Sequence, residues 1–263
     1  MDHRFALVTG ATSGIGAAFA RALPETTDLL ITGRDPERLA DMQEELSGDG
    51  RRVETMVADL TRPEHRQALI DRAEDLEIDL LINNAGMGKY GAVLDNDPGD
   101  EVATVELNCT APVALTTALL PGMIERARLD GGRAGLINLS STFAVQPVPY
   151  LATYTASKAF IQAWTEALAE EVRRKPVDVL ALAPGPTKTK FGERSGFTPG
   201  SFPFAADPDD IARDGLKQLG KCTVHVSGAV SRAALTPYFL PRRLAGTGLG
   251  ALMGVVSKAT RRG

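Results

Sequence analysis

Short apolar runs alternate with longer amphipathic segments along most of this chain. Seven of the short runs are predicted to be strands: residues 5–9, 29–32, 52–58, 80–83, 136–139, 177–182 and 223–226. Six segments between them space their apolar residues as helices do: residues 15–23, 36–46, 63–74, 99–126, 154–175 and 207–219. Alternating strands and helices favour a parallel sheet with helices on both faces, joined by right-handed crossovers. We therefore expect one α/β domain of the doubly wound Rossmann type, with no internal repeat or second domain.

Prolines complicate the longest helical segment, residues 99–126. Pro112 interrupts its pattern, and we expect the helix to end near or after Pro121. The charged residues that follow, 125–135, are then predicted to be a connection to the next strand.

Composition and charge narrow the class of protein. The chain has 263 residues, of which 43% are hydrophobic and 24% charged, as in an ordinary globular protein. Its net charge of −4 gives no reason to expect a nucleic-acid partner. No apolar run reaches roughly 18 residues, so we expect no membrane span, and the early first strand argues against a signal peptide.

The cysteines and histidines of the chain are isolated from one another. Cys109 and Cys222 lack C-x-x-C spacing, so we expect reduced thiols in a cytoplasmic protein. His3, His65 and His225 have no ligand pattern near them, so no metal site is expected.

Tyr154 and Lys158 lie four residues apart at the start of a predicted helix, which places both side chains on one face. A free tyrosine has a pKa of roughly 10, and a nearby ammonium group lowers it. Ser140 and Ser141 follow the strand at 136–139, and either hydroxyl can hold a carbonyl oxygen while the tyrosine supplies its proton. This chemistry suits reversible carbonyl reduction, but it needs a bound nicotinamide as the hydride donor.

A dinucleotide site is predicted at the N-terminus. The strand at 5–9 runs into the sequence TGATSGIG, residues 9–16, and a helix follows. Glycines permit a tight turn and a close approach of the backbone to pyrophosphate, and the helix N-terminus favours its charge. The three residues between Gly10 and Gly14 differ from the usual G-x-G-x-x-G, so the loop alone is a weak signal.

Together the motifs resemble the short-chain dehydrogenase/reductase family over residues 4–190. They run in the family's order: TGATSGIG at 9–16, Asp59 in VADL, NNAG at 83–86, Asn108 in ELNCTAP, Ser141, Tyr154 with Lys158, and PGPTKT at 184–189. The resemblance implies a Rossmann-type fold, a nicotinamide cofactor and a catalytic tetrad of Asn108, Ser141, Tyr154 and Lys158. It does not imply a substrate.

The resemblance also implies roles for single residues of the tetrad. Ser141 is preferred to Ser140 because its distance to Tyr154 matches the family spacing. Lys158 is expected to bond the nicotinamide ribose as well as to lower the tyrosine pKa. Asn108 resembles the asparagine that holds a kinked helix and a proton-relay water, with helix capping as the alternative.

The expected cofactor contacts follow the same motifs. Asp59 resembles the family's aspartate at the adenine, with an N-cap of the next helix as the alternative. Asn84 is expected beside the cofactor at the sheet edge, and Thr189 at its carboxamide or phosphate end. The full predicted set is Gly10, Thr12, Ser13, Gly14, Ile15, Gly16, Arg34, Asp59, Leu60, Asn84, Tyr154, Lys158 and Thr189.

The end of the second predicted strand indicates the cofactor. Sites that prefer NAD place a carboxylate there for the ribose hydroxyls, but Gly33 occupies that position and Arg34 follows. A guanidinium suits a 2′-phosphate, so we expect NADP(H). Asp35 followed by Pro36 is typical of a helix N-cap, although an inward-turned Asp35 favours NAD(H) instead.

Two segments lack periodicity. Residues 190–206 are rich in Gly, Pro and Phe, and in the family this region forms a lid over the substrate; a disordered connector is the alternative. The extension at 231–263 places paired arginines on both sides of a Gly-rich apolar run. A helix packed on the substrate side or on a partner subunit is favoured there, over an interfacial membrane helix or a disordered end.

We therefore expect an NADP-dependent oxidoreductase that interconverts a small, apolar carbonyl compound and its alcohol. A binding protein that senses NADP(H) without turnover is the alternative on the same fold. The resemblance implies a homodimer or homotetramer, and a stripe of Phe160, Trp164 and Leu168 is the expected core or subunit contact.

Overall fold

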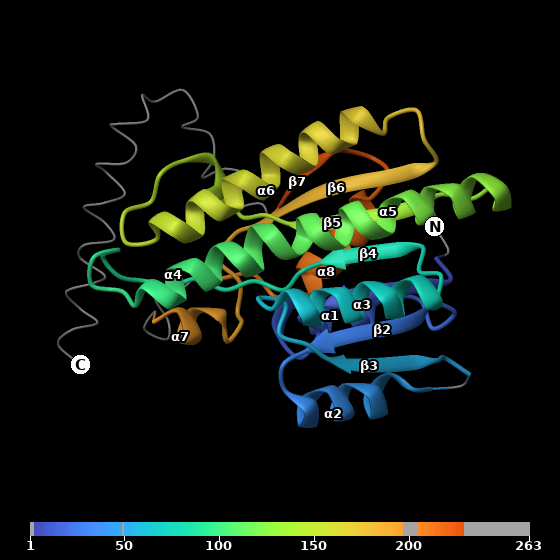
Figure 1. Cartoon of the computed structure of the whole chain (residues 1–263), viewed down its shortest axis with the longest axis horizontal. Coiled ribbons are helices and arrows are strands. Elements are labelled where there is room, and N and C mark those ends of the chain that lie inside the picture. The colour runs from blue at the N-terminus through green and yellow to red at the C-terminus, as the bar shows by residue number, and fades with distance from the viewer. Residues whose placement is uncertain (1–2, 49, 197–204, 229–263) are drawn as a thin grey trace.

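The computed structural model describes residues 3–48, 50–196 and 205–228. Its strands are β1 (Phe5–Thr9), β2 (Asp28–Gly33), β3 (Val53–Val57), β4 (Leu80–Asn83), β5 (Ala134–Leu139), β6 (Val177–Pro184) and β7 (Val224–Ser227). They form one sheet of order β3-β2-β1-β4-β5-β6-β7, in which every neighbouring pair is parallel (Figure 1). The predicted doubly wound sheet is confirmed.

Helices cover both faces of this sheet. The helical elements are α1 (Gly14–Ala22), α2 (Pro36–Leu46), α3 (Pro63–Asp75), α4 (Pro98–Val105), the π-helical turn η1 (Glu106–Thr110), α5 (Ala111–Asp130), the 3₁₀ turn η2 (Thr142–Val145), α6 (Ala152–Glu171), α7 (Phe191–Ser195) and α8 (Pro208–Gln218). Side chains of α1, α2 and α8 share one buried cluster, and those of α3, α5 and α6 share another. The sheet therefore lies between two layers of helices.

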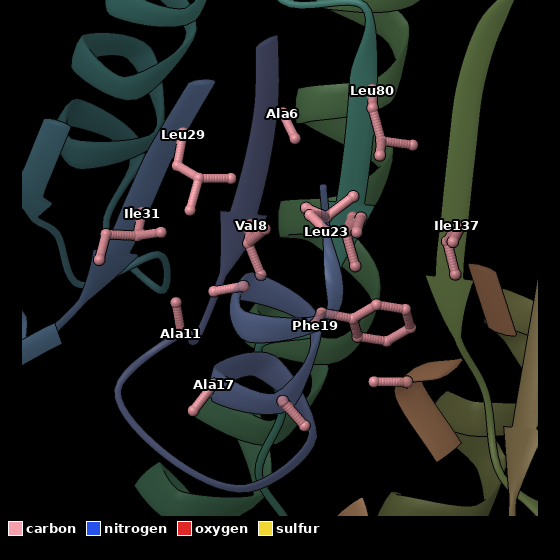
Figure 2. Close-up of a cluster of buried hydrophobic side chains, with 14 of the residues drawn as sticks. Ala6, Val8, Ala11, Ala17, Phe19, Leu23, Leu29, Ile31, Leu80 and Ile137 are labelled. Atoms are coloured by element: carbon pink, nitrogen blue, oxygen red, sulfur yellow. The ribbon is translucent and has the colours of Figure 1, made fainter. Parts of the chain in front are cut away.

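Alternation along the strands builds these two clusters. Ala6 and Val8 of β1 point toward α1, whereas Phe5 and Leu7 point to the opposite face. In Figure 2 the Phe19 ring of α1 reaches over the sheet among the strand side chains. Residues of central strands are buried on both faces, which explains why their sequences read as continuous apolar runs.

The structure contains the long helical stretch predicted at 99–126, but residues 125–130, which were expected to belong to the following connection, are helical. The structure has α4 and α5 joined by η1, and α5 continues to Asp130 with Pro121 inside it. Pro112 is the second residue of α5 and directly follows the wider turn η1, so the regular helical hydrogen bonding is already interrupted at this point. Gly131, with φ of +69°, ends α5 in the left-handed conformation.

One helical stretch among the described residues, Pro98–Asp130, is long and apolar enough to cross a membrane by length and composition alone. Its inward side packs into the core of the sheet through Leu115, Leu119 and Met123. That is the position of a core helix in this fold.

Parts of two predictions lie outside the described residues: the extension at 231–263, and positions 197–204 of the predicted lid. Within the lid region the structure contains the short helix α7, which the sequence pattern did not indicate.

Candidate active site

The candidate site lies where the strand order reverses, between the carboxyl ends of β1 and β4. Ligands of open α/β sheets bind at such a point, because the connections leaving the two strands diverge to opposite faces. A cavity of about 520 Å³ opens there. Most of the predicted site residues line it, whereas Gly16 and Asn108 lie behind its wall.

The glycine loop leaves no room for side chains. Gly10 and Gly14 have φ of +66° and +57°, a conformation that glycine adopts without strain. A Cβ atom at Gly10 would lie 2.9 Å from Cα of Ala85, and one at Gly16 would lie 2.3 Å from the carbonyl oxygen of Gly10. The loop presents bare backbone at the start of α1, which fits the pyrophosphate of a dinucleotide.

Thr9 and Asn84 lock this loop to the segment after β4. The Thr9 hydroxyl accepts the N–H groups of Asn84 and Ala85 at 2.9 and 3.0 Å. Asn84 Nδ2 donates to the carbonyl oxygens of Thr9 and Gly10 at 2.9 and 3.2 Å. Sequence reasoning missed Thr9, although a polar residue at the end of a buried strand was the available signal.

The predicted tetrad comes from three elements. Ser141 follows β5, and its hydroxyl hydrogen-bonds to the Tyr154 side chain near the start of α6. Ser140 instead donates to the Lys158 carbonyl oxygen at 3.2 Å and to Gln162 Oε1 at 3.0 Å. Of the two candidate serines, Ser141 therefore faces the tyrosine.

Lys158 lies one helical turn beyond Tyr154 and is buried. Its Nζ donates to the Leu139 carbonyl oxygen at 2.7 Å and lies 5.9 Å from the centroid of the Tyr154 ring. Burial lowers the pKa of Lys158 to about 8, although the neighbouring Cys109 thiol opposes this change.

The pKa of Tyr154 is raised in this arrangement, whereas the sequence led us to expect that Lys158 lowers it. Burial raises the pKa of Tyr154 to about 12, and the hydrogen bond from Ser141 offsets only part of that rise. Spacing places the lysine near the ring, but it does not reveal how much water the fold removes from the phenol.

Asn108 lies in η1, where the helix is widened to a π turn. Its Oδ1 accepts the N–H of Met87 at 3.0 Å, and its Nδ2 donates to the Met87 carbonyl oxygen at 2.8 Å and to Ser157 Oγ at 2.9 Å. The Ser157 hydroxyl in turn donates to the Tyr154 carbonyl oxygen at 2.7 Å. Asn108 is mid-helix and joins three elements around the tyrosine, so the alternative of a helix cap is wrong.

The end of the cavity away from Tyr154, called the far end below, carries the positive charge of Arg34. Arg34 is exposed and lines the wall directly after β2. A Cβ atom at Gly33 would lie 2.6 Å from Cγ2 of Thr12, so a side chain at this position requires Thr12 to turn away. Asp35 caps α2 by accepting the Arg38 N–H at 3.2 Å, pairs with Arg38 Nε at 3.2 Å, and is not in the wall.

Asp59 forms the neighbouring part of this wall. Its carboxylate accepts the Thr61 hydroxyl at 2.8 Å and the Thr61 N–H at 3.1 Å. Burial acts to raise the pKa of Asp59, but these bonds and the charge of Arg34 lower it overall. The N-cap of α3 is Arg62, so the alternative of Asp59 as that cap is wrong.

The cavity wall beside Tyr154 contains apolar side chains, of which sequence reasoning had singled out only Phe191, as part of the Phe-rich segment at 190–206. Phe191 of α7 packs on Tyr154 with 5.3 Å between ring centroids. Phe143 and Leu151 line the wall beside them. A Cβ atom at Gly88 would lie 2.7 Å from Cδ2 of Tyr154, so this glycine sets the position of the ring.

Comparison with known proteins agrees with this geometry. The family model described as short chain dehydrogenase matches residues 4–197. Sulfoacetaldehyde reductase 2 of Chromohalobacter salexigens is 36% identical over 189 residues, which cover 70% of this chain and 73% of that protein.

Solved structures show the same likeness. A short-chain dehydrogenase from Sphingobium yanoikuyae in complex with NADPH is 29% identical, with a TM-score of 0.79 over 89% of this chain and 92% of that one. A short chain dehydrogenase/reductase from Burkholderia phymatum in complex with NAD is 22% identical, with a TM-score of 0.76 over 90% and 91%, and shows the fold alone.

Proposed function

The chain belongs to the short-chain dehydrogenase family of NAD(P)-dependent oxidoreductases, and we propose that it interconverts a carbonyl compound and an alcohol with NADP(H) as preferred cofactor. One observation carries the proposal: a single cavity joins the cluster of Ser141, Tyr154 and Lys158 to a bare glycine loop and to Arg34. Bound NADPH supplies the hydride for such a reduction.

In this proposal Tyr154 transfers the proton. With a pKa of about 12 it holds its hydroxyl proton throughout the neutral range, so it acts as the general acid in reduction. Ser141 orients the tyrosine oxygen and the substrate oxygen beside it. The Lys158 ammonium, fixed by the Leu139 carbonyl oxygen, offsets the negative charge that develops when Tyr154 gives up its proton.

The charges at the far end of the cavity support NADP(H). A 2′-phosphate there meets Arg34, and the one carboxylate that directly follows Arg34 is held by Arg38 and by the start of α2. The positive charge of Arg34 contributes to lowering the pKa of Asp59, so the two side chains interact. In the proposed complex the Arg34 guanidinium therefore interacts with both Asp59 and the 2′-phosphate. Guanidinium–phosphate pairing gives NADPH its advantage over NADH.

The substrate is proposed to be an apolar carbonyl compound. Phe143, Leu151 and Phe191 supply aromatic and aliphatic surface beside Tyr154, and apolar walls with few polar groups are typical of small-molecule sites.

We propose a homodimer or homotetramer in the cytoplasm. α4 and α6 lie side by side over one face of the sheet (Figure 1), and exposed on them are Val102, Val105 and Phe160, at 63%, 43% and 46%. Exposed apolar side chains on two neighbouring helices favour a protein contact on this side of the molecule. The free thiols of Cys109 and Cys222 suit a reducing compartment.

The test is oxidation of NADPH and NADH by the purified protein over a panel of ketones, aldehydes, quinones and 3-oxoacyl thioesters. Arg34→Ala is compared with Arg173→Ala, an exposed arginine of the segment after α6 that lies outside the cavity wall. We expect Arg34→Ala to lower kcat/KM for NADPH roughly 10- to 100-fold, because a charge-assisted bond is lost. Its effect on NADH is expected to stay within about threefold, and Arg173→Ala is expected to change neither.

Two results would count against the proposal. Equal losses with NADPH and NADH on Arg34→Ala refute the role of Arg34 at the 2′-phosphate. If neither cofactor supports turnover of any compound on the panel, the proposed carbonyl reductase activity is contradicted. The alternative of a protein that binds NADP(H) without turnover is then favoured.

A further inference from the structure

A buried guanidinium connects two parts of the site that the proposed chemistry treats separately. Arg66 of α3 is only 8% exposed. Its Nη1 donates to the Leu60 and Thr61 carbonyl oxygens at 2.9 and 3.1 Å, and to Glu106 Oε2 at 3.1 Å. Arginine is almost never buried this deeply unless it is paired, so these bonds fix its position.

On one side Arg66 holds the wall at the Arg34 end of the cavity. Asp59 and Leu60 line that wall, and the Asp59 carboxylate is bound to Thr61. The two carbonyl oxygens that Arg66 holds belong to this same turn. The position of the wall therefore depends on the position of the guanidinium.

On the other side Arg66 holds the start of η1. Glu106 is the first residue of this turn, and the Ala111 N–H closes it on the Glu106 carbonyl oxygen. Leu107 lines the cavity, and Asn108 follows with its bonds to Met87 and Ser157. From Ser157 the hydrogen bonds continue to the Tyr154 carbonyl oxygen.

We propose that Arg66 is a positioning residue that couples the Asp59–Leu60 wall to the turn carrying Asn108, and so makes the catalytic geometry depend on the bound adenosine end of the cofactor. The inference rests on the proposed function, because it takes this wall to be the adenosine end of the NADP(H) site. One guanidinium bonds both sides, so a shift of the Leu60–Thr61 carbonyl groups moves Glu106. The guanidinium is buried and the Glu106 side chain is 38% exposed, so a charge-assisted bond joins the turn to a group that the fold holds in place.

The test compares Arg66→Met, Arg66→Lys and Glu106→Gln with the matched control Arg72→Met. Arg72 is on the same helix, but it pairs with Glu54 away from the cavity. We expect Arg66→Met to raise the Kd for NADPH and to lower kcat at saturating NADPH, each by roughly tenfold or more. Glu106→Gln is expected to lower kcat while the Kd changes less than about threefold, because the bonds to Leu60 and Thr61 remain.

Two further results are expected. Arg66→Lys keeps a charge but not the fork of donors, so its kcat is expected between those of wild type and Arg66→Met. Combining Arg66→Met with Glu106→Gln is expected to lower kcat no further than Arg66→Met alone, because position 106 has already lost its partner when the guanidinium is absent. If Arg66→Met does not fold, as its melting temperature shows, Arg66→Lys and Glu106→Gln decide the question.

Hydrogen exchange gives a readout that does not depend on turnover. In the wild-type protein, NADPH is expected to protect the amides of residues 106–111 and of Met87. In Arg66→Met that protection is expected to be lost even at saturating NADPH, and in Arg72→Met it is expected to persist.

The inference is overturned if Arg66→Met raises only the Kd for NADPH, with wild-type kcat at saturation and wild-type protection of residues 106–111. If the wild-type protein binds NADPH but turns over no compound of the panel, only the proposed reduction is refuted. The hydrogen-exchange experiment then still decides whether Arg66 couples the two sides. Wild-type protein that does not bind NADPH overturns both.

Discussion

At the scale of the residue, burial decides the chemistry of Tyr154 and Lys158. The four-residue spacing places both on one face of α6, and that much was readable from sequence. Burial then raises the pKa of the phenol and lowers that of the amine, so each group is held in its uncharged form more than in water. A tyrosine that keeps its proton suits reduction more than oxidation.

The buried amine of Lys158 has a consequence for stability. Its folded pKa of about 8 lies below the ordinary value of 10.5, so the unfolded chain binds this proton more tightly. The resulting destabilisation, ~3 kcal/mol, is fully present below pH 8 and fades as the pH rises from 8 to 10.5. We therefore expect Lys158→Met to be more stable than the wild type at pH 7, less the cost of the unpaired Leu139 carbonyl oxygen, about 1 kcal/mol.

Urea unfolding of both proteins at pH 7 and pH 9.5 measures this effect. The advantage of Lys158→Met is expected to shrink between the two values, whereas Lys217→Met, at an exposed lysine of α8, is expected to show no such change. An advantage that stays constant or grows with pH contradicts the assignment of a buried ammonium.

The site residues that could be predicted from sequence are those that belong to motifs with a characteristic residue type and spacing. The glycine loop, Ser141, Tyr154 and Lys158 are recognised by type and spacing, and the structure gathers them at one cavity. Gly88 and Phe143 could not be found in this way, because neither belongs to a motif with a fixed spacing. Their roles depend on their positions in the folded chain, where Gly88 contacts the Tyr154 ring and Phe143 lines the same cavity.

At the scale of the element, prediction succeeded where the pattern reflects burial on both faces. The central strands were found because two layers of helices cover them. The pattern was less informative at α5, where the end was expected near or after Pro121 and residues 125–130 were assigned to the following connection. A proline inside a helix costs about 3 kcal/mol or more, but burial of Leu119, Leu120 and Met123 contributes about 1.5–3 kcal/mol for each side chain.

The π turn η1 has no signature in the apolar pattern. A π turn contains one more residue than an α-helical turn. The apolar pattern therefore does not mark it, although the residues after it point in different directions from those of a regular helix. Such turns occur often at functional sites, and here the shift lets Asn108 reach Met87 and Ser157. The resemblance to a family with a kinked helix supplied what periodicity could not.

At the scale of the whole molecule, topology places the site, and the exposed apolar residues of α4 and α6 are the proposed contact for a second copy. Replacing Val102 and Phe160 together by aspartate is expected to convert the proposed oligomer to monomer, because the substitutions place charges in an apolar contact. Val57→Asp, at an exposed position of β3, serves as the control. Sedimentation velocity reports the result. A monomeric wild type, or a double variant that remains oligomeric, places the contact elsewhere or rules it out.

The measurement that most directly tests the account is single-turnover ketone reduction by NADPH-loaded Tyr154→Phe beside the wild type. Phenylalanine keeps the ring between Gly88 and Phe191 and removes only the hydroxyl. We expect the rate to fall by roughly 10²–10⁴-fold while the Kd for NADPH stays within about twofold, because the proton donor is lost and the cofactor site is not. A rate within about tenfold of the wild type would contradict the central claim that Tyr154 is the general acid.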